Sequence, residues 1–140
     1  MDQLRFKINK INTYKFETSD FTDTSIDKVR LETKIDFKKI ESHIIEIVVQ
    51  SKFYRGDIKN EIINISAGIT YDIHPEDFAE FIQNDGTIII PQNLAIYLSG
   101  LVVGSTRGIL SVRTENTKFS QFIIPPTTLD STIPSDIKIT

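Results

Sequence analysis

The run DIHPED, from Asp72 to Asp77, places three carboxylates and one imidazole close together in the chain. Hard cations and acid–base catalysts use these groups. Pro75 lies between a strand-like pattern and a helix-like pattern, so we expect the side chains on its two sides to diverge. The first turn of a helix also favours acidic residues, because of the helix dipole. We therefore predict no metal site in this run, although it is the basis of an alternative hypothesis of a metal enzyme or hydrolase.

Other features that could support catalysis are weak. The stretch from Gly100 to Gly108 (GLVVGSTRG) lacks the Gly-Lys-Ser/Thr ending of a phosphate-binding loop and lies inside a helical pattern. The chain has no cysteine, which excludes thiolate catalysis and Cys-type zinc sites. His43 lies between two predicted strands, and we expect it in a solvated turn. We predict no catalytic residue, no cofactor and no enzymatic activity.

Aromatic residues gather near the ends of two predicted strands and in the segment that follows them. The chain has nine phenylalanines and four tyrosines but no tryptophan. By default such rings belong to the core; alternatively, they line an apolar groove that holds an extended hydrophobic peptide. Under the second interpretation, the residues predicted to contact a client peptide are Phe53, Tyr54, Tyr71, Phe78, Phe81 and Ile82.

Composition limits the class of protein. The 140 residues carry 16 Lys and Arg against 19 Asp and Glu, and they contain no basic run that could displace counterions from nucleic acid. The longest apolar region, 88–103, is interrupted by Pro91 and Gly100 and falls short of the ~20 residues of a membrane span. The first residues alternate charged and apolar side chains, unlike a signal peptide. We expect one cytoplasmic domain that neither binds nucleic acid nor inserts into a membrane.

Four stretches alternate apolar and polar residues with the period of a β-strand, at 4–16, 28–38, 45–53 and 63–73. In the first stretch the parity changes, which predicts a bulge or a bend. Short polar connectors follow the second and third, so we expect antiparallel hairpins there. Isoleucine, 25 of the 140 residues, adds to the preference for strands. One apolar and one polar face per strand indicate a sheet that needs cover on one side only.

Helical patterns replace this alternation in the second half of the chain. Pro75 opens a short pattern, and Pro91 opens a long one that reaches about Glu115. The predicted fold class is therefore α+β: a four-stranded antiparallel sheet, a crossing loop with a short helix, and one long C-terminal helix. Prolines and hydroxyl residues mark the end of the chain. We expect one domain over residues 1–126 and an extended or partly disordered tail over 127–140.

Three glycines spaced by four lie within the long helical pattern. Each costs up to ~1 kcal/mol relative to alanine in a helix interior. Such a stripe is tolerated where a second helix packs closely, here the same helix of another subunit. The alternative is that the helix breaks at Gly104 or Gly108. The residues predicted at an oligomer interface are Tyr97, Gly100, Leu101, Gly104 and Gly108.

The order of these elements and several local motifs resemble the SecB-like protein-export chaperones. The motifs are LRFKINKINTYKFET at the start, INISAGITYDI in the fourth strand, and IIIPQNLAIYLSGLVVGSTRGIL followed by IIPPTTL. Ala67-Gly68-Ile69 is similar to the fourth-strand signature of that family, and Pro91 with the leucines after it is similar to the start of its main helix. The resemblance covers nearly the whole chain, and none of its motifs is catalytic.

The resemblance implies an ATP-independent holdase that binds unfolded polypeptides and assembles as a homotetramer, a dimer of dimers. Family members deliver clients to the motor ATPase of the secretion pathway, and relatives protect the antitoxins of toxin–antitoxin modules. The export members engage the motor through acidic residues on the sheet and in the tail. Here Lys15 stands at the matching position on the first strand, and Lys138 offsets one of the two tail acids, Asp130 and Asp136. We therefore expect client binding more than coupling to the motor.

A second hypothesis comes from a different class. The chain could be a dedicated structural or adaptor protein, for example the chaperone of one partner such as an antitoxin, with all its aromatic residues in the core. A hydrophobic dye distinguishes the two, because a general chaperone exposes apolar surface in its native state and a well-covered adaptor does not.

Overall fold

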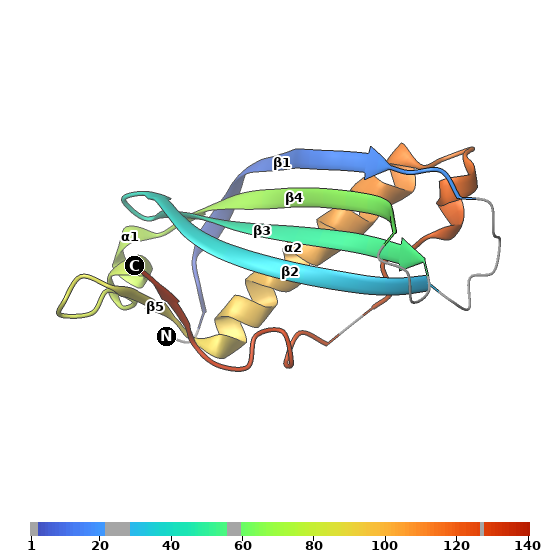
Figure 1. Ribbon diagram of the computed structural model, residues 1–140. Coiled ribbons are helices and arrows are strands. Elements are labelled where there is room, and N and C mark those ends of the chain that lie inside the picture. Colours follow the sequence, from blue (N-terminus) through green and yellow to red (C-terminus); the bar gives the residue numbers. More distant parts are fainter. Residues whose placement is uncertain (1–2, 22–28, 56–59, 127) are drawn as a thin grey trace.

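The computed structural model describes residues 3–21, 29–55, 60–126 and 128–140. They form a sheet of four long strands, a short helix, a long helix and a small second sheet (Figure 1). In chain order the elements are β1 (Phe6–Thr18), β2 (Val29–Glu41), β3 (Ile44–Arg55), β4 (Glu61–Ile73), α1 (Pro75–Ala79), β5 (Ile88–Ile90), α2 (Gln92–Arg113), η2 (Lys118–Gln121) and β6 (Ile137–Ile139). The predicted α+β class is confirmed.

The large sheet has the order β1-β4-β3-β2, and every neighbouring pair is antiparallel. The expected β2–β3 and β3–β4 hairpin pairings are confirmed. β1 pairs with β4 and not with β2, so β1 and β2 are the two edge strands. The change of parity in β1 is confirmed as two register shifts, between Ile8 and Lys10 and between Thr13 and Lys15.

The alternation of side chains between the two faces of β3 and β4 determines which face of the sheet α2 covers. Residues of one parity, such as Ile47 in β3 and Ile65 in β4, are fully buried. α2 lies across this face (Figure 1) and buries Leu98 against it. Burying each such side chain stabilises the fold by about 1.5–3 kcal/mol. α2 is continuous over 22 residues, so the alternative in which it breaks at Gly104 or Gly108 does not hold.

On the opposite face, a glycine makes room for a buried carboxylate. A Cβ added at Gly68 of β4 would lie 3.1 Å from both Tyr14 Cε2 and Glu46 Oε2. Glu46 is 2% exposed; it accepts a hydrogen bond from the Tyr14 hydroxyl and pairs with Lys38 Nζ at 3.1 Å. The bond to Glu46 raises the pKa of Tyr14, because it stabilises the protonated phenol. The absence of a side chain at Gly68 thus lets Glu46 find the partners that a buried charge needs.

The C-terminal residues 128–140 run beside α2 and end next to β5 (Figure 1). Their apolar side chains Leu129, Ile133 and Ile139 are buried, and β6 pairs antiparallel with β5. Upstream, Arg107 of α2 donates from Nε to the carbonyl of Ile124 at 2.6 Å. The described part of the tail is therefore packed onto the rest of the chain, with a turn at residues 130–132 before β6. Thr127 lies outside the described residues, and the boundary between residues 126 and 127 stays a prediction.

Tyr71 links the sheet to α2, and we expect its hydroxyl to contribute measurably to stability. It is fully buried, and its hydroxyl donates to the Leu98 carbonyl at 2.7 Å. Tyr71→Phe should lower the free energy of unfolding by about 0.5–1.5 kcal/mol, measured by urea denaturation. Tyr97→Phe is the control, because Tyr97 is 57% exposed. Equal losses in the two variants would contradict the prediction.

Candidate functional site

The six residues predicted to contact a client peptide do not form one exposed surface. Four of them are at most 4% exposed: Phe53, Tyr71, Phe78 and Phe81. Ile82 is 48% exposed, and Tyr54 is half-buried. In the single chain these four rings therefore belong to the core. Client contact by the six residues stays a prediction.

The separation of Phe53 from Tyr54 follows from strand geometry. Consecutive residues of a strand point to opposite faces of the sheet. Phe53 points to the α2 side and packs against Phe122, with ring centroids 5.7 Å apart. Tyr54 points to the other side, where the Arg30 guanidinium carbon lies 4.8 Å from its ring centre. These two neighbours therefore cannot line one groove.

A groove of about 530 Å³ lies between the segment before β1, the segment after α1 and the first turn of α2. Its apolar lining consists of Leu4, Phe81, Ile89, Pro91 and Leu94. Its polar lining consists of Glu80, Gln83 and Asn93. Phe81 is thus a predicted residue that reaches the groove, and the exposed Ile82 follows it in the chain. The groove thus combines apolar side chains and polar groups in comparable measure, and an extended peptide has both side chains and a polar backbone to place against such a lining.

A tight chain reversal places Phe81 beside Ile89. The Ile89 amide donates to the Phe81 carbonyl at 2.9 Å, and the Gln83 amide donates to the Thr87 carbonyl at 2.8 Å. Gly86 has a φ of 87°, in the left-handed region that glycine adopts without steric cost. The turn thus brings two apolar residues of the groove, Phe81 and Ile89, next to each other on its two arms.

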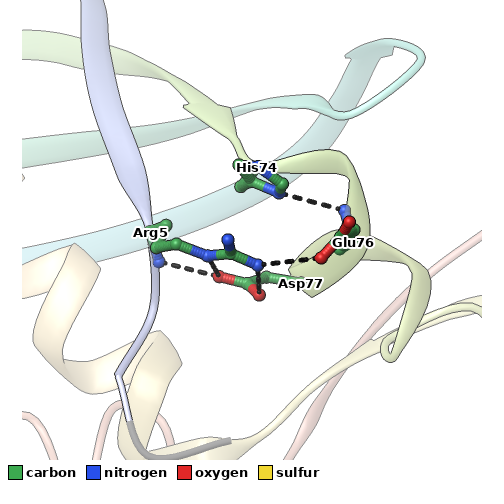
Figure 2. Close-up of polar contacts among 4 residues, drawn as sticks. All are labelled: Arg5, His74, Glu76 and Asp77. Carbon is green, nitrogen blue, oxygen red and sulfur yellow. Dashed lines mark hydrogen bonds and ion pairs between the residues drawn. The ribbon is translucent and has the colours of Figure 1, made fainter.

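Arg5 joins the start of β1 to α1, next to the groove residue Leu4 (Figure 2). Its Nη2 donates to Asp77 Oδ1 at 2.8 Å, and its Nε and backbone amide donate to Asp77 Oδ2 at 3.2 Å and 2.9 Å. The same Nη2 lies 3.4 Å from Glu76 Oε2. Hydrogen bonds from Arg5 lower the pKa of Asp77 to about 2, because they stabilise the carboxylate. This clamp fixes α1, and with it the segment that carries Phe81.

The other members of DIHPED turn to separate partners. His74 Nδ1 accepts a hydrogen bond from the Glu76 amide at 3.2 Å and so caps α1 (Figure 2). Asp72 Oδ1 lies 3.0 Å from His43 Nε2. His43 lies in the turn between β2 and β3, as expected, but its side chain is not fully solvated, because it is partly buried against a carboxylate of β4. In the described part of the chain, no group of three His, Cys, Asp or Glu residues is placed to hold a metal ion.

The residues predicted at an oligomer interface lie on a side of α2 that is open in the single chain. A Cβ added at Gly100, Gly104 or Gly108 would meet no atom of the described residues within 4 Å, apart from the helix backbone and chain neighbours. Tyr97 is 57% exposed, and Leu101 is half-buried. The small side chains therefore leave room on this face, and an interface through them stays a prediction.

The edge strand β1 continues this open face. The Tyr97 ring contacts Phe6 of β1, with centroids 6.3 Å apart. Further along β1, Ile8 and Ile11 are 46% and 50% exposed. Their partners in β4 point into the core under α2, so these isoleucines lie on the same side of the sheet. An apolar strip therefore runs along β1 and α2.

α2 is long and apolar enough, by length and composition, to cross a membrane. Its most apolar 18-residue window has a mean hydropathy of 1.4, and 39% of that window is buried. A core helix of a globular protein meets the same criterion. Since α2 packs on the sheet, its composition is explained by the fold, and the absence of membrane insertion stays a prediction.

Sequence reasoning did not assign Leu4, Ile89, Pro91 and Leu94 to a site. The apolar residues on both sides of Pro91 were a usable signal, because the proline marks the point where the chain passes from an apolar strand into a helix. Leu4 had no such signal. It reaches the groove because β1 pairs with β4, a contact between distant parts of the sequence that local spacing does not encode.

Comparison with known proteins shows the fold. No protein-family model and no curated protein sequence matches the chain. The solved structure of the SecB-like chaperone Rv1957 of Mycobacterium tuberculosis, in complex with a ChAD peptide from the HigA1 antitoxin, is similar, with a TM-score of 0.61 and 8% identity. The match covers 88% of this chain and 90% of that one. The chain thus has the SecB-like fold, as the sequence motifs predicted.

A second solved structure is less similar. It is a protein of unknown function from Streptococcus agalactiae, with a TM-score of 0.36 and 12% identity. The match covers 89% of this chain and 99% of that one.

We expect the Arg5–Asp77 clamp to make stability depend on pH in acid. The pKa of Asp77 is lowered to about 2 in the folded chain. The stabilisation of the fold by its carboxylate is therefore complete above the ordinary pKa near 3.8 and is lost as the pH falls toward 2. Asp77→Asn should lower the melting temperature at pH 7, and this deficit should shrink between pH 4 and pH 2. Glu76→Gln is the control, because the Glu76 side chain is 81% exposed. A deficit that is constant across this range would contradict the prediction.

Proposed function

We propose that this protein is an ATP-independent holdase that binds extended apolar segments of unfolded polypeptides in the groove around Phe81 and Leu94. One observation carries the proposal: a groove of about 530 Å³, with five apolar residues in its lining, opens on a SecB-like fold. A protein of this fold, the M. tuberculosis SecB-like chaperone, has been solved with a peptide of an antitoxin. Peptide binding is therefore a property that the fold can support, and the groove offers a place for it.

Holding a client in this groove requires no chemical step. Client side chains that leave water against Leu4, Phe81 and Leu94 gain about 25 cal/mol for each Å² of apolar area buried. The Asn93 side chain in the groove lining offers the client backbone a donor and an acceptor, whereas Gln83 Nε2 already donates to the Phe81 carbonyl. A client held in this way cannot use the same apolar side chains to aggregate. We accordingly propose a non-enzymatic protein without a cofactor.

The buried aromatic residues support the groove in this proposal. The Phe78 ring packs against that of Phe81, with centroids 6.1 Å apart, and so backs the groove wall. Tyr71 fixes α2 on the sheet through the Leu98 carbonyl. Direct client contact is assigned to Phe81 and its exposed neighbour Ile82. Phe53 and Tyr54 lie near the far end of β3, and we assign them no direct contact with a segment in this groove.

We further propose that the chain forms a homo-oligomer, a dimer of dimers, through the open face of α2. The exposure of Tyr97 and the free space over Gly100, Gly104 and Gly108 support a close helix contact. The exposed Ile8 and Ile11 of β1 extend the apolar surface available to a second copy. This assembly would cover apolar area that a single chain leaves in water.

A second candidate function is the protection of one dedicated partner, such as an antitoxin. The M. tuberculosis structure favours it, because the peptide in that complex comes from an antitoxin. Either function suits a cytoplasmic location. Coupling to the secretion motor is the weaker proposal, since the matching acidic position on β1 is occupied by Lys15.

We expect the protein to suppress light scattering by an aggregating client, and Leu94→Asp to weaken this protection by about tenfold, equal to about 1.4 kcal/mol. An aspartate in the first turn of α2 is favoured by the helix dipole, so the variant should fold. Ile123→Asp is the control, because Ile123 is 64% exposed and does not line the groove. No protection by the natural chain at several-fold molar excess would refute the proposal, and equal protection by Leu94→Asp would refute the site.

We expect Gly104→Leu to reduce the native mass at micromolar concentration, because a large side chain would collide with a helix packed on the stripe. Gly104→Ala is the matched control: it also replaces the glycine but adds only one carbon. The Cβ that both changes add meets no described atom within 4 Å other than the helix backbone and chain neighbours, so we expect both monomers to fold. Unaltered size-exclusion behaviour of Gly104→Leu would contradict the predicted interface, as would a monomeric natural chain.

A further inference from the structure

The end of the chain occupies an edge of β5 in the way that an extended peptide would. β6 pairs antiparallel with β5, with Ile88 opposite Ile139 and Ile90 opposite Ile137. Ile139 is 6% exposed and Ile137 is half-buried, whereas Lys138 between them is exposed. An apolar residue, a solvent-facing residue and a second apolar residue in extended conformation form the pattern by which a strand adds to a sheet edge.

β6 takes an edge of β5 that would otherwise be open. The other edge is used by the preceding turn, where the Ile89 amide bonds the Phe81 carbonyl. Backbone groups alternate in direction along a strand, so those of Ile88 and Ile90 point away from that turn, toward β6. Without the tail, the described residues would leave these backbone groups as a free template for another chain.

The tail also supplies a carboxylate that caps the N-terminus of α2. Pro91, at the start of this helix, has no side-chain cap, and the first turn contains no acidic residue. Asp136 Oδ1 instead accepts a hydrogen bond from the Gln92 amide at 2.8 Å, and Gln92 Nε2 donates to the Ile133 carbonyl at 2.9 Å. A carboxylate at a helix N-terminus is favoured by the free amides and by the helix dipole.

This edge is continuous with the groove described above. Ile89 of β5 lines the groove, and the strand partner of Ile89 is Lys138 of β6. Pro91 and Leu94, close to the amide that Asp136 caps, line it as well. A peptide paired with β5 would therefore lie next to the groove and could extend into it.

Resting on the proposed holdase function, we propose that β5 is the docking strand for client segments and that the chain's own residues 136–139 occupy it as an internal competitor. The preferred client segment has an acidic residue followed by apolar–any–apolar, as in Asp136-Ile137-Lys138-Ile139. The carboxylate caps the Gln92 amide, the two apolar side chains enter the core beside Ile88 and Ile90, and the middle side chain faces solvent. Client binding at β5 requires the tail to leave.

The tail is suited to such exchange. Its ladder with β5 has only three residue pairs, and short pairings open more easily than long ones. A two-stranded sheet of this size is marginally stable without further packing. When a competitor fills a site for most of the time, the apparent affinity for a ligand falls in proportion to the free fraction of the site.

The test uses the full chain and a fluorescent peptide with the sequence of residues 133–140, IPSDIKIT, followed by anisotropy. Ile139→Ser removes a buried contact of the tail, so this variant should bind the peptide at least about tenfold more tightly than the natural chain. Lys138→Ser is the matched control on the same strand and should bind like the natural chain. A peptide with both isoleucines replaced by serine should not bind.

Hydrogen exchange on the natural chain gives a readout that needs no variant to fold. Saturating peptide should speed exchange at the amides of Ile137 and Ile139 and leave those of Ile88 and Ile90 protected. Unchanged exchange at β6 with the peptide bound, or equal peptide affinity of Ile139→Ser and the natural chain, would overturn the inference. If the natural chain still protects a client from aggregation in that case, the holdase function stands and only the docking strand is wrong.

Discussion

One helix has to cover one face of a four-stranded sheet, and it is too narrow to do so. A helix with its side chains is about 10–12 Å across, whereas four strands spaced about 4.8 Å apart present a wider face. α2 lies over the two central strands, β3 and β4. The apolar side chains of the edge strands therefore need a different cover, and most of the functional features of this chain lie at those margins.

The two margins of the sheet, along β2 and along β1, differ in what covers their apolar side chains. On the β2 side the chain provides its own cover, because the C-terminal tail runs there and buries Leu129, Ile133 and Ile139. On the β1 side Ile8, Ile11 and the glycine side of α2 stay open. A second copy suits the open margin, since its apolar strip is long and its glycines permit a close approach. The proposed exchange with a client concerns only the last part of this cover, where β6 pairs with β5 through three residue pairs.

Much of the fold could be predicted from the sequence because its signals are local. Period-two alternation identified the strands, and prolines identified the starts of both helices. The parity change in β1 was visible as a slip between Ile8 and Tyr14, and the structure shows register shifts there. The exposed fractions of the aromatic residues were not predictable, because alternation shows which side of the sheet a ring faces and not whether another segment covers that side.

The site was harder to predict because it is built from contacts between distant residues. Leu4, Phe81 and Leu94 meet only after β1 pairs with β4 and α2 folds back over the sheet. The docking of the tail was equally hidden. A stretch of threonines, serines and a proline that precedes Ile137-Lys138-Ile139 suggests an open chain, yet two isoleucines at strand spacing suffice to pair with β5.

The Arg5–Asp77 clamp fixes the part of the chain that leads into the wall on which the tail is paired. A binding surface needs one part that yields and one part that keeps its shape. Arg5 holds α1 through three hydrogen bonds to Asp77, and the turn after α1 is closed by backbone bonds between Phe81 and Ile89. β5 is therefore fixed on its inner edge and lightly covered on its outer edge. In the proposed exchange, a client would displace the tail without disturbing the wall against which it binds.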